Sequence, residues 1–345
     1  MVCHPERSEG SAFRGGLQIP RFARDDKILE MPPASYNSRI KPRALRPGDK
    51  VGIVAPASNV KREMLEAGSE GLRRAGYEPF YFESILERDL YFAGSVERRV
   101  RELEDMFARD DIRAIVCARG GYGSNYLPLT LDARKIVPNP KILVGYSDIT
   151  TLVCCMADSA NFVTFHGPMV AKDFAVADGV DLDSWQNALG GAAEWEIGEG
   201  SGAKPLLAGE AEGILYGGCL SMLVASLGTQ HEIRTAGTIL FMEDVAAKPY
   251  QIDRMLMQLK LAGKLNDVRG MVFGEMLDCR QSPDQDYTLE EVVRRIVGDL
   301  RIPVAFGLRS GHVSRANITL PIGVRARLTV EDSVELRILE AATVK

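Results

Sequence analysis

The stretch K-I-L-V-G-Y-S-D-I-T, residues 141–150, is the most informative part of this chain for both fold and chemistry. Ile142 to Gly145 form a short continuous apolar run, which predicts a buried strand. From Asp148 onward the sequence is typical of the beginning of an apolar helix. Ser147 therefore stands at a sharp strand-to-helix turn, where its hydroxyl lies beside the first free N–H groups of the helix. A hydrolase uses this arrangement as a nucleophile next to an oxyanion site. The alternative is a serine that only caps the helix.

Short apolar strands alternate with helices on both sides of this stretch. Continuous apolar strands connected by helices indicate a parallel sheet that is covered on both faces. We therefore predict an α/β fold whose N-terminal domain, residues 44–171, has a doubly wound parallel sheet and carries the nucleophile. The strands are expected at 50–58, 77–82, 112–118, 142–145 and 162–169, and helices at 61–76 and 96–109.

The second half of the chain has a different pattern of residues. Residues 172–206 are acidic and rich in glycine, and we interpret them as an interdomain connection. Residues 207–345 are strand-rich and are predicted to form an α+β domain, a sheet or partial barrel with helices on one side. Its strands are expected at 211–218, 238–244 and 270–275, with a hairpin over 325–339, and its helices at 219–227, 251–263 and 289–297. Residues 1–43 are expected to be a disordered extension, because their first part is polar, Gly/Ser-rich and aperiodic.

Composition narrows the class of function. The net charge is −5 and no strong Lys/Arg cluster occurs, which argues against nucleic acid as a partner. No apolar stretch is long enough to span a bilayer. The six cysteines form no C-x-x-C pair, as expected in a reducing cytoplasm, and the four histidines show no H-E-x-x-H spacing. We therefore expect a cytoplasmic protein without a metal or other cofactor, and no membrane partner.

A serine nucleophile needs a base and an acid that orients the base. His312 lies in F-G-L-R-S-G-H-V, where flanking glycines indicate an exposed loop. Glu243 ends the apolar run I-L-F-M-E-D, and a carboxylate there is placed to lean into a cleft, since burial inside the strand would be costly. The alternative for Glu243 is a solvated strand end.

The glycine-rich turn R-G-G-Y-G-S, residues 119–124, follows the strand before the one that leads to Ser147. Ligands bind beyond the carboxyl ends of strands in doubly wound sheets, so the two turns should lie together. The backbone N–H groups of Gly121 and Asp148 then form the two halves of an oxyanion hole. A phosphate-binding loop is disfavoured, because the turn matches neither glycine fingerprint of such loops.

Taken in order, the segments A-R-G-G-Y-G-S, G-Y-S-D-I-T, F-H-G-P-M, F-M-E-D-V and G-L-R-S-G-H resemble the LD-carboxypeptidase family of serine peptidases. The resemblance covers roughly residues 44–340 and implies a triad of Ser147, Glu243 and His312, with the site between two domains. It also implies a murein peptide substrate, release of its terminal D-Ala in cell-wall recycling, and a homodimer. Arg119 and Gly120 are candidates for binding the substrate carboxylate, although a solvated side chain is the favoured interpretation of Arg119 alone.

Two other functions stay open at this point. A microcin-immunity-type hydrolase of peptidyl or aminoacyl adenylates belongs to the same family, and Trp185 and Trp195 lie where that branch carries a base-stacking aromatic residue. A non-catalytic small-ligand-binding α/β protein is the alternative of another class. One departure from the family pattern concerns the lining of the cleft, where Ala247 and Lys248 precede P-Y in place of an acidic residue.

Overall fold

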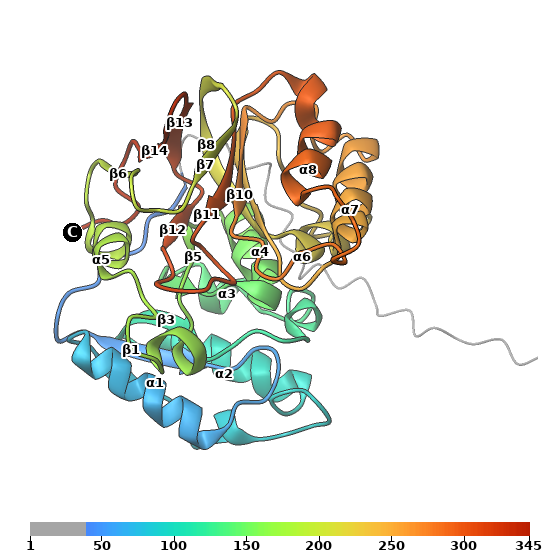
Figure 1. Cartoon of the computed structure of the whole chain (residues 1–345). Helices are drawn as coiled ribbons and strands as arrows, with labels where there is room; N and C mark the ends of the chain where they lie inside the picture. Colours follow the sequence, from blue (N-terminus) through green and yellow to red (C-terminus); the bar gives the residue numbers. More distant parts are fainter. Residues whose placement is uncertain (1–38) are drawn as a thin grey trace, which may run out of the picture.

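The computed structural model describes residues 39–345, and these residues form two sheets surrounded by helices (Figure 1). The first sheet has six strands in the order β12-β5-β4-β3-β1-β2. Strands β1 to β5 run parallel, and β12 joins the edge antiparallel to β5. The bounds are β1 Lys50–Val54, β2 Glu78–Phe80, β3 Ile112–Cys117, β4 Ile142–Val144, β5 Thr164–His166 and β12 Leu320–Ile322. The predicted parallel sheet is confirmed.

Helices connect the parallel strands of the first sheet, as their apolar periodicity predicts. Ser95 caps one of them by accepting a hydrogen bond from the backbone N–H of Arg98, which stabilises the first helical turn. The helices in this part of the chain are α1 Arg62–Arg74, α2 Val96–Ala108, α3 Ala133–Ile136 and α4 Thr150–Ser159. Figure 1 shows α1 and α2 at the lower end of the molecule, away from the second sheet.

The second sheet has eight strands in the order β6-β14-β13-β8-β9-β10-β11-β7. Its centre, β8 to β11, is parallel, and helices α6, α7 and α8 make the connections between successive strands. The predicted hairpin is confirmed as the antiparallel pair β13 and β14. The bounds are β6 Trp195–Ile197, β7 Lys204–Leu207, β8 Gly209–Cys219, β9 Thr238–Glu243, β10 Gly270–Gly274, β11 Val304–Leu308, β13 Arg325–Val330, β14 Val334–Ile338, α6 Leu220–Ala225, α7 Pro249–Leu261 and α8 Leu289–Val297.

The strands do not divide cleanly at the expected domain boundaries. Residues 172–206, interpreted as a connection, contain helix α5 (Leu182–Gly190) and supply β6 and β7, the two edge strands of the second sheet. Conversely, β12 lies in the expected second domain but pairs with the first sheet. These strands are only three or four residues long, too short for a periodic pattern to reveal them.

The expected extension 1–43 lies mostly outside the described residues, which begin at residue 39. Ile40 forms a bridge with Phe162, and its backbone N–H donates to the carbonyl of Asn161. Arg39 forms an ion pair with Asp158 at 3.3 Å. Residues 39–43 are therefore packed against the body of the protein, and the boundary at residue 43 is placed too late.

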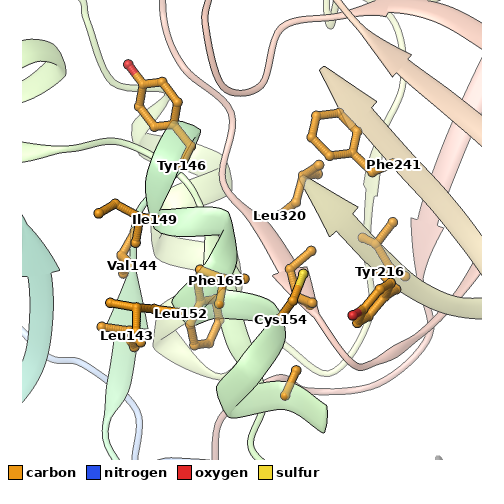
Figure 2. Close-up of a cluster of buried hydrophobic side chains, with 14 of the residues drawn as sticks. Leu143, Val144, Tyr146, Ile149, Leu152, Cys154, Phe165, Tyr216, Phe241 and Leu320 are labelled. Carbon is orange, nitrogen blue, oxygen red and sulfur yellow. The ribbon is translucent and has the colours of Figure 1, made fainter. Parts of the chain in front are cut away.

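Side chains from both sheets meet in one buried core (Figure 2). Val144 and Phe165 come from the first sheet, whereas Tyr216 and Phe241 come from the second, and all four are inaccessible to solvent. Burying side chains of this size contributes about 1.5–3 kcal/mol each relative to exposure. The shared core keeps the carboxyl ends of β4 and β9 in a fixed position relative to each other. Within residues 39–345, none of the helices combines the length and apolarity that crossing a bilayer requires.

Candidate active site

Ser147 occupies a strained turn between β4 and α4. Its φ is 63°, a left-handed value that residues other than glycine rarely adopt, and a 3₁₀ turn over Ser147–Ile149 precedes the helix. Its side chain does not cap a helix, because the N-cap positions are Tyr146 for the turn and Ile149 for α4, with no side-chain cap at either. Such strain costs about 1–3 kcal/mol and is concentrated at functional sites. The geometry therefore favours a nucleophile over a capping serine.

The glycine-rich turn lies directly against Ser147. A Cβ atom on Gly120 would stand 2.8 Å from the Cβ of Ser147, 3.0 Å from its Oγ and 3.3 Å from the backbone N of Asp148. Gly121 has a φ of 111°, and a Cβ there would stand 2.4 Å from Oγ of Ser58. The two turns are therefore adjacent, and only glycine allows this close approach.

Buried polar contacts fix the two turns relative to each other. Oδ2 of Asp148 accepts a hydrogen bond from the backbone N–H of Ser124 at 2.8 Å, and the Ser124 hydroxyl donates to the carbonyl of Asp148. Burial raises the pKa of the Asp148 carboxyl above its ordinary value. Arg99 ties the glycine-rich turn to the turn after β1, since its Nη1 donates to the carbonyls of Pro56 and Gly123 at 2.8 and 2.7 Å. A backbone held in this way can present N–H groups in fixed directions.

Glu243 and His312 form a tight pair at the carboxyl end of β9. Oε2 of Glu243 accepts from the backbone N–H of His312 at 2.9 Å and lies 2.7 Å from its Nδ1. The expectation that Glu243 leans into an open cleft is wrong, because its side chain is 0% exposed. The side chain of His312 is 13% exposed, so the imidazole lies between the carboxylate and solvent.

The pKa of Glu243 reports how its burial is compensated. Burial favours the neutral acid, but the hydrogen bonds and charge of His312, together with His166, outweigh it and hold the pKa below its ordinary value. Glu243 is therefore ionised at neutral pH. An ionised carboxylate bonded to Nδ1 keeps the proton there and leaves Nε2 of His312 able to accept a proton.

Residues that sequence reasoning missed shape this pair. A Cβ on Gly274 would stand 2.5 Å from the Cβ of Glu243, and one on Gly311 would stand 2.5 Å from its Cδ. Asn317, fully buried, exchanges two 3.0 Å hydrogen bonds with the backbone of Gly311 and so closes the His312 loop. The glycines were visible in the sequence, but no local pattern connects them with a glutamate 31 or 68 residues away.

Ser147 and the Glu243–His312 pair meet around Tyr146. The rings of Tyr146 and His312 pack edge to face with their centroids 5.1 Å apart, and Tyr146 directly precedes Ser147 in the chain. No hydrogen bond joins Ser147 to His312 within the described part of the chain. Catalytic hydrogen bonds of this kind are often long in the absence of substrate and tighten when substrate binds.

Arg119 lies on the rim of the site. Its side chain is exposed, and Nη1 donates to the carbonyl of Asn59 at 3.3 Å. Gly120 is buried beside Ser147. Across residues 39–345, no group of three or more His, Cys, Asp or Glu side chains is arranged to hold a metal ion.

Comparisons with known proteins show which family this chain matches. Residues 51–167 match the model of the LD-carboxypeptidase N-terminal domain, and residues 212–328 match that of the C-terminal domain. A probable murein peptide carboxypeptidase of Bacillus subtilis is 35% identical over 86% of this chain and 94% of its own. A microcin self-immunity protein of Escherichia coli is 27% identical over 83% of this chain and 92% of its own.

Among solved structures, a muramoyltetrapeptide carboxypeptidase from Oxalobacter formigenes superposes with a TM-score of 0.76 at 30% identity. The superposition covers 84% of this chain and 98% of that one. Both family models fall on the segments that carry the strained serine and the buried Glu–His pair. This chain belongs to the LD-carboxypeptidase family of serine-type peptidases and is a hydrolase.

Proposed function

We propose that this chain is a serine carboxypeptidase that cleaves an L,D-peptide bond and releases the terminal D-Ala of murein tetrapeptide in cell-wall recycling. The observation that carries the proposal is the strained turn at Ser147, packed on Gly120, beside a buried Glu243–His312 pair. The murein peptide carboxypeptidases among the relatives support the choice of substrate.

In the proposed reaction Ser147, Glu243 and His312 act as a triad. Nε2 of His312 takes the proton of the Ser147 hydroxyl as Oγ attacks the carbonyl before the terminal D-Ala. The backbone N–H groups of Gly121 and Asp148 stabilise the resulting oxyanion. His312 returns the proton to the leaving amine of D-Ala, and water then hydrolyses the acyl-enzyme with His312 again as base. Glu243 holds the imidazole and stabilises its charged form.

Recognition of the substrate carboxylate is assigned to Arg119 and to the backbone at Gly120. Arg119 is the charged donor at the start of the glycine-rich turn, and a guanidinium binds a carboxylate through two hydrogen bonds. A free terminal carboxylate is what distinguishes a carboxypeptidase substrate from an internal peptide bond. Extended or amidated peptides should therefore not be cleaved.

We further propose a cytoplasmic homodimer. The described cysteines, Cys117, Cys154, Cys155, Cys219 and Cys279, are all buried free thiols, as suits a reducing compartment. The homodimer is implied by the family resemblance. Sedimentation at several protein concentrations tests it.

One observation weighs against the microcin-immunity alternative. Trp185 is 0% exposed, its Nε1 donates to the hydroxyl of Tyr77 at 3.2 Å, and Phe174 packs edge to face against its ring. A core tryptophan of this kind cannot stack on a nucleobase. Trp195, the other candidate, is only partly buried on the edge strand β6. Assaying murein tetrapeptide against an aminoacyl sulfamoyl adenylate decides between the two functions, and we expect the tetrapeptide to be the better substrate.

The experiment that tests the proposal measures release of alanine from tetrapeptides that end in D-Ala or L-Ala. Wild type should strongly prefer the D-terminal peptide, and Ser147→Ala should lose about 10⁴-fold or more in rate while keeping its melting temperature. Equal rates on the two peptides would rule out the L,D-carboxypeptidase assignment. Near-wild-type activity of the Ser147→Ala protein would rule out the nucleophile.

A further inference from the structure

His166 is a buried polar residue that the proposed mechanism leaves without a role. It ends β5, pairs in the sheet with Leu320 of β12, and is 0% exposed. Neither of its ring nitrogens has a hydrogen-bond partner among the described residues. A neutral imidazole has one N–H donor and one acceptor, and leaving such a group unpaired costs about 1–3 kcal/mol. Buried polar groups are almost always paired, so this one requires an explanation.

The surroundings of His166 place it beside the Glu243–His312 pair. Its ring packs edge to face on Phe241, with centroids 4.9 Å apart, and Phe241 precedes Glu243 by two residues on β9. Alternate residues of a strand point to the same face, so Phe241 and Glu243 share the face that His166 contacts. The ring centroid of Tyr146 lies 5.9 Å from that of His166 and 5.1 Å from that of His312.

Glu243 has an unused acceptor in this same region. Both hydrogen bonds from His312 go to Oε2, and Oε1 is buried without a partner among the described residues. The carboxylate is close enough to His166 for its charge to interact with the protonated form of that imidazole. One buried acceptor and one buried donor, each unpaired, therefore lie behind the proposed triad, on the side away from solvent.

We propose that His166 is a positioning residue whose neutral imidazole donates a ring N–H to Oε1 of Glu243, directly or through one bound water molecule. The inference rests on the proposed function, because it concerns the orientation of the proposed triad. With only Oε2 held, the carboxylate is free to turn about its terminal torsion. With both oxygens held, Oε2 stays aligned with Nδ1 of His312. Burial lowers the pKa of His166 to about 4, so the imidazole is neutral at physiological pH.

The test compares His166→Phe, which removes the donor but keeps a ring, with His166→Gln, which keeps an N–H donor. The reaction followed is release of D-Ala from murein tetrapeptide. Mutating the hydrogen-bond partners that orient metal ligands lowers metal affinity or activity by about 10–100-fold, and we expect a loss of the same size for a partner that orients Glu243. We expect His166→Phe to lose about 10–100-fold in kcat with little change in KM, and His166→Gln to stay within about 5-fold of wild type. If the melting temperature shows that His166→Phe does not fold, the His166→Gln variant alone decides. A kcat below one tenth of wild type in folded His166→Gln protein then overturns the proposal.

A second arm separates positioning from packing. In a Glu243→Ala background the acceptor is gone, so His166→Phe should lower kcat by no more than about 2-fold. The proposal is overturned if His166→Phe lowers kcat as much in the Glu243→Ala background as it does in wild type. It is also overturned if His166→Phe alone leaves kcat unchanged. Labelling of Ser147 by an alkyl fluorophosphonate gives a readout that needs no peptide substrate. Slower labelling of His166→Phe with no tetrapeptide turnover by wild type would sink the proposed function while leaving this inference standing.

Discussion

Replacing Gly120 by alanine is the substitution whose effect on activity can be worked out most directly from the structure. The new Cβ would lie 2.8 Å from the Cβ of Ser147 and 3.0 Å from its Oγ. Carbon atoms pack at about 3.5–4.0 Å, so either Ser147 or the glycine-rich turn must move by about 0.7–1.2 Å. The φ of Gly120 is not left-handed, so the backbone itself accepts alanine without strain.

A misplacement of about 1 Å at a reacting group costs about 100-fold in rate, equivalent to about 2.7 kcal/mol in the activation barrier. We therefore expect Gly120→Ala to lower kcat for D-Ala release about 100-fold, with a smaller change in KM. Gly298→Ala is the matched control, because Gly298 is exposed at the end of α8 and a Cβ there meets no atom within 4 Å. A Gly120→Ala protein with kcat within 3-fold of wild type would refute the reasoning, since the nucleophile would then tolerate the displacement.

Three further predictions concern the acid, metal dependence and pH. Glu243→Gln should lower kcat about 10³–10⁴-fold, because the amide no longer fixes the proton on Nδ1 of His312, and steady-state rates check this. Activity should survive exhaustive chelation by EDTA, whereas loss of activity that zinc restores would point to different chemistry. Burial lowers the pKa of His166 from 6.5 to about 4. Between these two pH values the unfolded chain binds more protons at this site than the folded protein does. The stability that neutral His166 contributes is therefore lost as the pH falls from about 6.5 to 4. Chemical denaturation at pH 7 and 4.5 measures the free energy of unfolding of wild type and of His166→Gln. Between the two pH values, the difference between these free energies should change by up to about 3 kcal/mol, in favour of the variant at the lower pH. A difference that stays constant would contradict the lowered pKa of His166.

Sequence reasoning located the elements of this fold wherever a long apolar pattern existed. The helix predicted at 289–297 is observed as α8 over the same residues, and the strand predicted at 112–118 is observed as β3 over Ile112–Cys117. It failed for β6, β7 and β12, which are edge strands of three or four residues. The pairing of such strands depends on tertiary contacts rather than on their own side-chain pattern.

The candidate site shows the same division between local and distant information. The turn at Ser147 could be predicted because strand, serine and helix are consecutive in the chain. The burial of Glu243 could not, because the cost of a buried carboxylate argues against it until its partner is known. That partner, His312, is 69 residues away, and its backbone and ring together supply two hydrogen bonds to a single oxygen. His166 was visible in F-H-G-P-M, but nothing local indicates that its nitrogens lie unpaired behind Glu243.

The path of the chain around His312 explains how Ser147 and His312 keep their relative position. His312 follows β11 of the second sheet by four residues and precedes β12, which pairs with β5 of the first sheet, by eight. The loop is thus tied to both sheets, and Asn317 closes it from within. Interfaces between domains are usually modest and mobile, so a site assembled from two freely moving domains would need another support such as dimerisation. Here the covalent chain and the β5–β12 pairing provide that support within one protomer. Dimerisation is therefore not required to hold the proposed triad together, and a monomeric form should keep the Glu243–His312 pair in place beside Ser147.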